Sequence, residues 1–182
     1  MGNLNKLDNG WTRRHGQAGV YQVASQLLLR GVNVYFPAVD SGVDLVTDSG
    51  IRIQVKMTHL ARRARRDQQI YAGGAYWFHF MQRKVVKGGK GLMTVRGRDF
   101  ASECDLVVLW GVDHNRFWIV PACELAECQC TVLAGVHNGA YKRATRPDSR
   151  AQKIMNFENR WDLVTSHDEL IHDPDAVEQE VK

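Results

Sequence analysis

Three side chains near the middle of the chain, Asp44, Gln54 and Lys56, carry groups that act together in metal-assisted chemistry. A carboxylate, an amide oxygen and the backbone carbonyl of Val55 are hard oxygen ligands of the kind that Mg²⁺ binds. Such a cation neutralises charge on a phosphate and acidifies a bound water, and an ammonium group stabilises the charged transition state. The residue types therefore indicate chemistry on a phosphate ester. An ordinary hairpin with a polar outer face is the alternative.

The segment 42–56 predicts a β-hairpin, and the length of its turn decides which side chains share a face. A two-residue turn at 49–50 mixes polar and apolar side chains on both faces. A three-residue turn with Gly50 in the left-handed conformation separates them, so we predict the second register. It places the three candidate side chains on one face. The predicted cross-strand pairs are Val43 with Val55, Asp44 with Gln54, Leu45 with Ile53, Val46 with Arg52 and Thr47 with Ile51.

Apolar periodicity predicts one helix followed by about six strands. The helix covers residues 16–30, and a short element near 156–164 packs Phe157 and Trp161 back on the body. The aromatic side chains around residues 76–80 are expected in the core. This order predicts an α/β fold with a mixed central sheet flanked by helices. The predicted strands cover residues 32–36, 43–47, 51–57, 76–81, 105–112 and 117–120.

Charge is unevenly distributed along the 182 residues. The formal net charge is +4, yet residues 167–182 hold six acids and one lysine, which leaves a surplus of nine positive charges in residues 1–166. We therefore predict one domain at 1–166 and an acidic, mobile tail at 167–182. A basic body favours a polyanionic partner, most simply nucleic acid, over a merely solvated basic surface.

The basic residues occur in groups where apolar periodicity fades. We therefore place these groups in loops or on short exposed helices, from which long cationic side chains can contact a phosphate backbone. The candidate DNA contacts are Arg62, Arg63, Arg65, Arg66, Lys84, Lys87, Lys90, Arg96 and Arg98.

No apolar stretch is long enough to span a bilayer, and the first residues lack the apolar block of a secretory signal. Four cysteines in a chain of this size do not form the pattern of a disulfide framework. We therefore expect a soluble, cytoplasmic protein with no membrane partner.

Asp44, followed ten residues later by Gln54-x-Lys56, resembles the signature of the PD-(D/E)xK nuclease superfamily. The closest likeness is to the branch that contains group I intron homing endonucleases and Holliday-junction resolvases. The likeness is strongest over residues 16–56 and covers most of 16–164. Further similar segments are the helix opening Gly16-Gln17-Ala18-Gly19, LLRGVNVYFP at 28–37, FWIVP at 117–121 and Asn159-Arg160-Trp161.

The resemblance implies a restriction-endonuclease-like fold and a DNA endonuclease that cleaves phosphodiester bonds with Mg²⁺ or Mn²⁺. Asp44, Gln54 and the Val55 carbonyl would be the metal ligands, and Lys56 the catalytic lysine. Since a two-fold DNA target needs two sites, we expect a homodimer or a higher symmetric oligomer.

Two positions depart from the family pattern. Val20 stands where members often carry a glutamate, and Gln54 stands where most carry an acid. Asp44 is then the one carboxylate of the matched motif, which weakens cation binding because ligand charge supplies much of the attraction. A catalytically impaired DNA-binding protein on the same fold is therefore an alternative, and a partner-binding scaffold is another.

Overall fold

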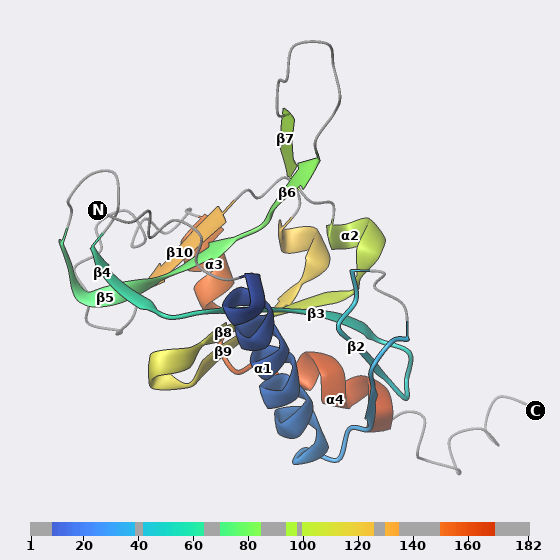
Figure 1. The fold of residues 1–182 in the computed structure, drawn as a ribbon. Helices are drawn as coiled ribbons and strands as arrows, with labels where there is room; N and C mark the ends of the chain where they lie inside the picture. Colours follow the sequence, from blue (N-terminus) through green and yellow to red (C-terminus); the bar gives the residue numbers. More distant parts are fainter. Residues whose placement is uncertain are drawn as a thin grey trace, which may run out of the picture.

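The computed structural model describes residues 9–38, 42–63, 70–84, 94–97, 100–125, 130–134 and 150–169 (Figure 1). Helix α1 begins at Asn9, seven residues before the predicted start. The sequence did not predict this first part because residues 9–15 carry no apolar period. The helices are α1 (Asn9–Leu28), α2 (Phe100–Glu103), α3 (Arg150–Met155) and α4 (Asp162–Glu169), with short 3-10 turns η1 (Val112–His114) and η2 (Ala122–Leu125).

A five-stranded sheet forms the centre of the molecule in the order β1-β2-β3-β8-β9. The β3–β8 pair is parallel and the other three pairs are antiparallel, so the predicted mixed central sheet is confirmed. Its strands are β1 (Val34–Tyr35), β2 (Leu45–Thr47), β3 (Arg52–Thr58), β8 (Leu106–Gly111) and β9 (Arg116–Pro121).

Two further sheets include strands that the apolar pattern does not predict. A three-stranded sheet has the order β10-β5-β4, and a separate ribbon, β6–β7, extends away from the central sheet (Figure 1). Several of these strands are polar or basic, so they form through backbone pairing with neighbours rather than through a local apolar alternation. They are β4 (Leu60–Arg63), β5 (Ile70–His79), β6 (Met81–Lys84), β7 (Thr94–Gly97) and β10 (Cys130–Ala134).

The two faces of the central sheet carry two separate core clusters. The first cluster joins α1, α4 and one face of the sheet. The second joins the opposite face to β5, β10, α2 and α3. Alternate residues of β8 divide between them: Leu106 and Val108 belong to the first cluster, and Val107 and Leu109 to the second. Both faces are therefore covered, which explains the continuous apolar run of this strand.

Most of the aromatic side chains predicted in the core enter these clusters, whereas Trp77 is half-buried and belongs to neither. Tyr76, Phe78 and Phe80 are buried in the second cluster, where Phe157 also packs, and Trp161 is buried in the first. The C-terminal segment also adds to the sheet, since the N–H of Ile119 donates to Phe157 O (3.0 Å) and the N–H of Asn159 donates to Phe117 O (2.9 Å).

The helix α4 continues to Glu169, three residues into the segment predicted as a tail, and residues 170–182 lie outside the described part of the chain. None of the helices in the described ranges has the length and hydropathy needed to cross a membrane.

Candidate active site

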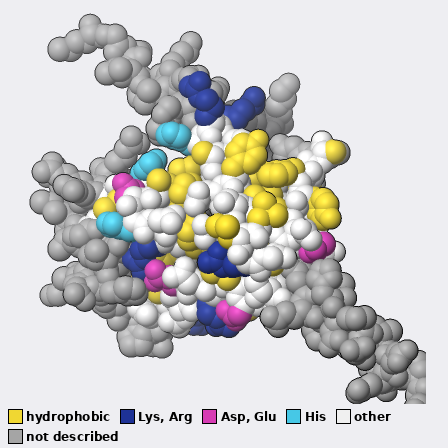
Figure 2. Space-filling model, turned by 90° about the horizontal axis from the view of Figure 1, so that it is seen from below, with side chains coloured by type: hydrophobic (Ala, Val, Ile, Leu, Met, Phe, Trp, Pro, Cys, Tyr) yellow, Lys and Arg dark blue, Asp and Glu magenta, His cyan; other side chains and the backbone are white. Residues whose placement is uncertain are grey.

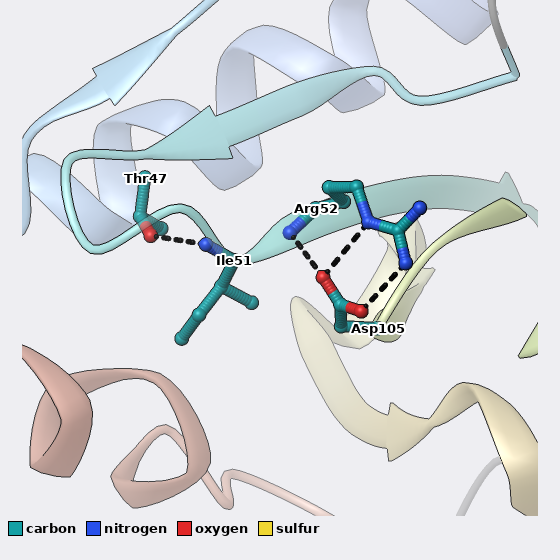
Figure 3. Close-up of polar contacts among 4 residues, drawn as sticks. All are labelled: Thr47, Ile51, Arg52 and Asp105. Carbon is teal, nitrogen blue, oxygen red and sulfur yellow. Dashed lines mark hydrogen bonds and ion pairs between the residues drawn. The ribbon is translucent and has the colours of Figure 1, made fainter.

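The β2–β3 hairpin positions the candidate residues, and its turn is the one predicted. Gly50 has a φ of +86°, a conformation that glycine adopts without strain. Its N–H donates to the carbonyl of Thr47 (3.0 Å), and the Thr47 hydroxyl accepts from the N–H of Ile51 (3.0 Å; Figure 3). The ladder pairs Leu45 with Ile53 and Val46 with Arg52, which confirms the predicted register for these pairs.

The chain leaves this ladder at Asp44, one residue before β2. The N–H of Asp44 donates to the carbonyl of Ile53 (2.9 Å), so Asp44 is not paired opposite Gln54. Val43 packs against the second core cluster instead of facing Val55, so that predicted pair is also wrong. Because the strands diverge here, the Asp44 carboxylate can bond to the backbone of β3 itself.

One carboxylate oxygen of Asp44 accepts two hydrogen bonds from β3. Asp44 Oδ2 accepts from the N–H of Val55 (2.7 Å) and from Nε2 of Gln54. The same Nε2 donates to the carbonyl oxygen of Val55 (3.3 Å). The amide of Gln54 therefore lies between two oxygens, and the three groups proposed as metal ligands come together at one point.

Lys56 lies two residues beyond Gln54 on β3. Gln54 is 5% exposed and Lys56 is half-buried. Side chains two residues apart on a strand point to the same face, so both lie on the face opposite to Val55, which packs in the first cluster. On β8, Val107 is opposite Gln54 and Leu109 is opposite Lys56. The candidate site thus lies on the sheet face that carries the second cluster.

The groups around Gln54 suit a hard divalent cation. Asp44 and Val55 present oxygens there, and Gln54 Oε1 is buried and has no hydrogen-bond partner within the described residues. Mg²⁺ takes carboxylate, carbonyl and amide oxygens and keeps several waters. Across the described ranges, no three His, Cys, Asp or Glu side chains gather as a metal-binding group. Within the described residues, Asp44 is the carboxylate whose contacts place it beside Gln54 and Val55.

The N-terminal end of β3, which we call the entry end, is held to β8 by Asp105, as Figure 3 shows. Asp105 Oδ2 accepts from the N–H of Arg52 (2.8 Å) and from its Nε (3.1 Å), and Oδ1 accepts from Nη2 (2.8 Å). The hydrogen bond from the Arg52 side chain holds the pKa of Asp105 below its ordinary value. Two elements far apart in the sequence are thereby fixed in register.

The C-terminal end of β3, which we call the exit end, is held in a similar way by Asp113. Asp113 Oδ2 accepts from the N–H of Leu60 (2.7 Å), and His59 Nδ1 lies 3.5 Å away. The backbone hydrogen bond from Leu60 is the main reason why the pKa of Asp113 is lowered. The hydroxyl of Tyr76 accepts from the N–H of His114 and contacts His114 Nδ1, both at 3.0 Å.

Sequence reasoning did not identify these anchors. Asp105 and Asp113 lie at either end of β8 and are eight residues apart, and so are their backbone partners Arg52 and Leu60. This equal spacing is a signal that the sequence contains. The two anchors can be inferred from this spacing only when β3 and β8 are known to be parallel neighbours, and that pairing is a long-range property of the fold.

The helix α1 brings no acid to the hairpin at the position singled out by the sequence. Val20 is 7% exposed and packs in the first core cluster together with Val55. The position at which members of the PD-(D/E)xK superfamily often carry a glutamate therefore makes an apolar contact between helix and sheet in this chain.

The structure corrects the placement of those candidate DNA contacts that it describes. Arg62 and Arg63 end β4, Lys84 ends β6, and Arg96 lies in β7, so these residues are in strands rather than in loops or short helices. Their strands pair in antiparallel ribbons, which the charged sequence does not reveal. Arg65, Arg66, Lys87, Lys90 and Arg98 lie outside the described residues.

The described elements form an α/β fold in which helices flank a mixed central sheet, as the sequence predicts. A solved structure with a similar fold is that of a bacterial homing endonuclease, I-Ssp6803I, with a TM-score of 0.64. The match covers 88% of this chain and 97% of that chain at 16% sequence identity, a level at which the likeness shows the fold. No protein-family model and no curated protein matches the sequence.

Proposed function

We propose that this chain is a metal-dependent DNA endonuclease of the PD-(D/E)xK superfamily, related to the homing endonucleases and Holliday-junction resolvases. The observation that carries the proposal is the meeting of Asp44 Oδ2, the Gln54 amide and the Val55 carbonyl on the face that also bears Lys56. The fold similarity to a homing endonuclease supports it.

Asp44, the carbonyl of Val55 and Oε1 of Gln54 would hold Mg²⁺ or Mn²⁺. The cation, when bound, neutralises charge on the phosphate and lowers the pKa of a coordinated water. Lys56 supplies a fixed positive charge on the same face, where its ammonium group stabilises the negative charge that develops on the attacked phosphate. The burial of Gln54 keeps this part of the site away from bulk water, which strengthens these charge interactions.

DNA is the proposed partner, held through its phosphates. Arg62, Arg63, Lys84 and Arg96 lie on two antiparallel ribbons, β4–β5 and β6–β7, and the second ribbon extends away from the central sheet (Figure 1). Cationic side chains on such strands can contact a phosphate backbone without reading base sequence. We assign the same role to Arg65, Arg66, Lys87, Lys90 and Arg98, and we place the enzyme in the cytoplasm.

A DNA-binding protein that has lost catalysis is the second candidate. The observation in its favour is the buried Val20, since α1 then contributes no carboxylate at that position and Asp44 is the one acid of the motif. This candidate retains the basic ribbons and predicts DNA binding without cleavage.

The decisive experiment measures cleavage of plasmid and branched DNA with Mg²⁺ or Mn²⁺. The wild-type chain is expected to cut, and Asp44→Asn and Lys56→Ala are each expected to lower the rate by about 100-fold or more, because each removes a charge that acts on the transition state. Lys153→Ala is the matched control, since Lys153 is an exposed lysine on α3. Its cleavage rate should stay at the wild-type level.

Equal cleavage by the wild type, Asp44→Asn and Lys56→Ala would remove the proposed site. Binding by the wild type without cleavage would favour the second candidate. For a nuclease and for a DNA-binding protein without catalysis alike, DNA affinity should fall steeply as the salt concentration rises, with a log–log slope near −0.9 per phosphate contact. A partner-binding scaffold would show little affinity for DNA at any salt concentration.

A further inference from the structure

The first half of α1 carries all of the charge of that helix. Within Asn9–Leu28 the charged residues are Arg13 and Arg14, and the helix contains no aspartate or glutamate. Both arginines are exposed, and Arg13 has no acid three or four residues away with which a helical ion pair could form. Cations near the start of a helix oppose the helix dipole. Helix stability therefore does not explain the charge at this position.

The start of α1 lies against the exit end of β3. The rings of His15 and His59 are 5.7 Å apart between their centres, at an angle of 55°. About one turn further along the helix, a Cβ added at Gly19 would lie 3.2 Å from the Cβ of Met57. Arg13 and the residue after it directly precede His15 in the sequence. The two arginines therefore lie near the end of the candidate catalytic strand.

His59 is held in place by the η1 turn as well. Its Nδ1 lies 3.5 Å from Oδ2 of Asp113, and its side chain is 51% exposed. Asp113 is itself fixed by the N–H of Leu60, which donates to the same oxygen at 2.7 Å. The carboxylate lies against Nδ1, so Nε2 is the ring nitrogen that a ligand from outside can contact. The imidazole is thus positioned by a carboxylate and by the ring of His15.

The surface of α1 that follows His15 is open. Gly16, Gln17 and Ala18 are exposed, and a Cβ added at Gly16 would meet nothing within 4 Å. Figure 2 shows histidine side chains close together along one side of the visible face, with an acidic group beside them and basic groups near them. Within the described residues, no bulky side chain blocks the approach of a chain to this part of α1.

The chemistry of these groups fits phosphate. Guanidinium groups bind phosphate with parallel N–H donors, and an imidazole carries one N–H when neutral and two when charged. His59 follows Lys56 by three residues, a distance of about 10 Å along an extended strand. Each strand of duplex DNA carries a phosphate about every 3.4 Å along the axis. A DNA strand with one phosphate at Lys56 therefore has further phosphates within reach of His59 and the start of α1.

We propose that Arg13, His15 and His59 form a second phosphate-binding site, which holds the DNA strand beside the phosphate that is cleaved. We call it the α1–β3 site, and Asp113 is its positioning residue because it orients His59. The inference rests on the proposed function, since it names further contacts of the same substrate. It goes beyond that function because the basic residues assigned to DNA above all lie outside α1.

Binding of a fluorescently labelled DNA duplex, measured by anisotropy in EDTA so that no cleavage occurs, tests the proposal. Arg13→Ala is expected to weaken binding by about 8-fold at about 0.1 M NaCl and to reduce the log–log salt slope by about 0.9, as the loss of one phosphate contact does. The matched control is Arg150→Ala. Arg150 is exposed at the start of α3, and Ile154 of that helix packs in the second core cluster, across the sheet from α1. Its affinity and slope should stay at the wild-type level.

His59→Gln tests the imidazole. An imidazole between the Asp113 carboxylate and a DNA phosphate is favoured in its charged form, so the affinity of the wild type should rise as the pH falls from about 8 to about 6. His15 faces the same ring from α1 and remains in this variant, so part of the rise should persist. We expect the rise to be about threefold smaller in His59→Gln than in the wild type. Circular dichroism verifies that each variant is folded.

Arg63→Ala, on β4, separates this inference from the proposed function. If Arg63→Ala weakens binding while Arg13→Ala and His59→Gln bind DNA as the wild type does, the α1–β3 site is overturned and DNA remains the partner. An effect of Arg150→Ala equal to that of Arg13→Ala would also overturn the site, because a general loss of positive charge would then explain both. A wild type that binds no DNA would overturn both proposals.

Discussion

The two ends of β3 are held by different kinds of interaction. The entry end depends on Arg52 and Asp105, whose side chains are 43% and 45% exposed. The exit end has the exposed carboxylate of Asp113 and, in addition, Tyr76, which is fully buried and packs on Gly111 while its hydroxyl bonds to His114. An exposed carboxylate therefore holds the candidate catalytic strand at each end, and buried packing is added only at the exit end.

This difference predicts how firmly each part of the strand is held. Exposed ion pairs contribute little to stability and weaken in salt, whereas buried aromatic packing is sensitive to a single added methyl group. Gln54 lies two residues from the entry end and so depends on the weaker anchor. A change at the exit end should unfold the domain more readily, and a change at the entry end should act more on the site.

Gly111→Ala should have the largest effect on stability. A Cβ at this position would lie 2.8 Å from Cζ of the Tyr76 ring, too close for the buried ring to remain in place. We expect a loss of about 2 kcal/mol in the free energy of unfolding, measured by urea denaturation. Gly16→Ala is the control, because its Cβ meets nothing within 4 Å and lies within α1. It should stabilise the chain by up to about 1 kcal/mol; equal effects of the two changes would contradict the packing argument.

Asp105→Ala should have a smaller effect, lowering the thermal midpoint by about 3 °C, because it removes three hydrogen bonds at an exposed site. Asp105→Asn keeps an oxygen that can accept from the Arg52 N–H and should lose about half as much. In about 1 M NaCl the difference between these variants and the wild type should shrink. A difference that grows with salt would show that charge is not what holds this end.

The smallest expected effects concern pH. The pKa of Asp105 is lowered in the folded chain, so its contribution is complete above its unfolded pKa of about 4 and is lost as the pH falls through the folded value. Burial raises the pKa of Tyr76, so its contribution is complete below about pH 10 and is lost as the pH rises further.

Urea denaturation across the pH range checks both signs. Asp105→Asn should flatten the acid limb of the stability curve, and Tyr76→Phe should flatten the alkaline limb. If the gap between wild type and Asp105→Asn widens as the solution is acidified, the charge at the entry end does not stabilise the fold.

The sequence predicts the hairpin register because local rules determine it. Gly50 sets the turn, and the alternation of apolar and polar residues around Ile53 sets the face. The offset at Asp44 is not predictable in the same way, since it depends on Val43 packing against a cluster built from distant strands. The basic strands are likewise not predictable from the local sequence, because pairing with neighbouring strands, rather than an alternation of their own side chains, makes them strands.

Gln54 gives the hairpin a property that a second acid would not. A glutamate there would bring a second negative charge against Asp44, and neighbouring carboxylates resist ionising together. A side-chain amide instead carries a donor and an acceptor on one planar group, and half a turn about its last bond exchanges them. The N–H group that now bridges Asp44 and Val55 can thus give way to an oxygen without any movement of the strands. On the proposal that a cation binds here, the hairpin would accept it by this rotation alone, and the hydrogen bonds of the amide hold the same groups together without one.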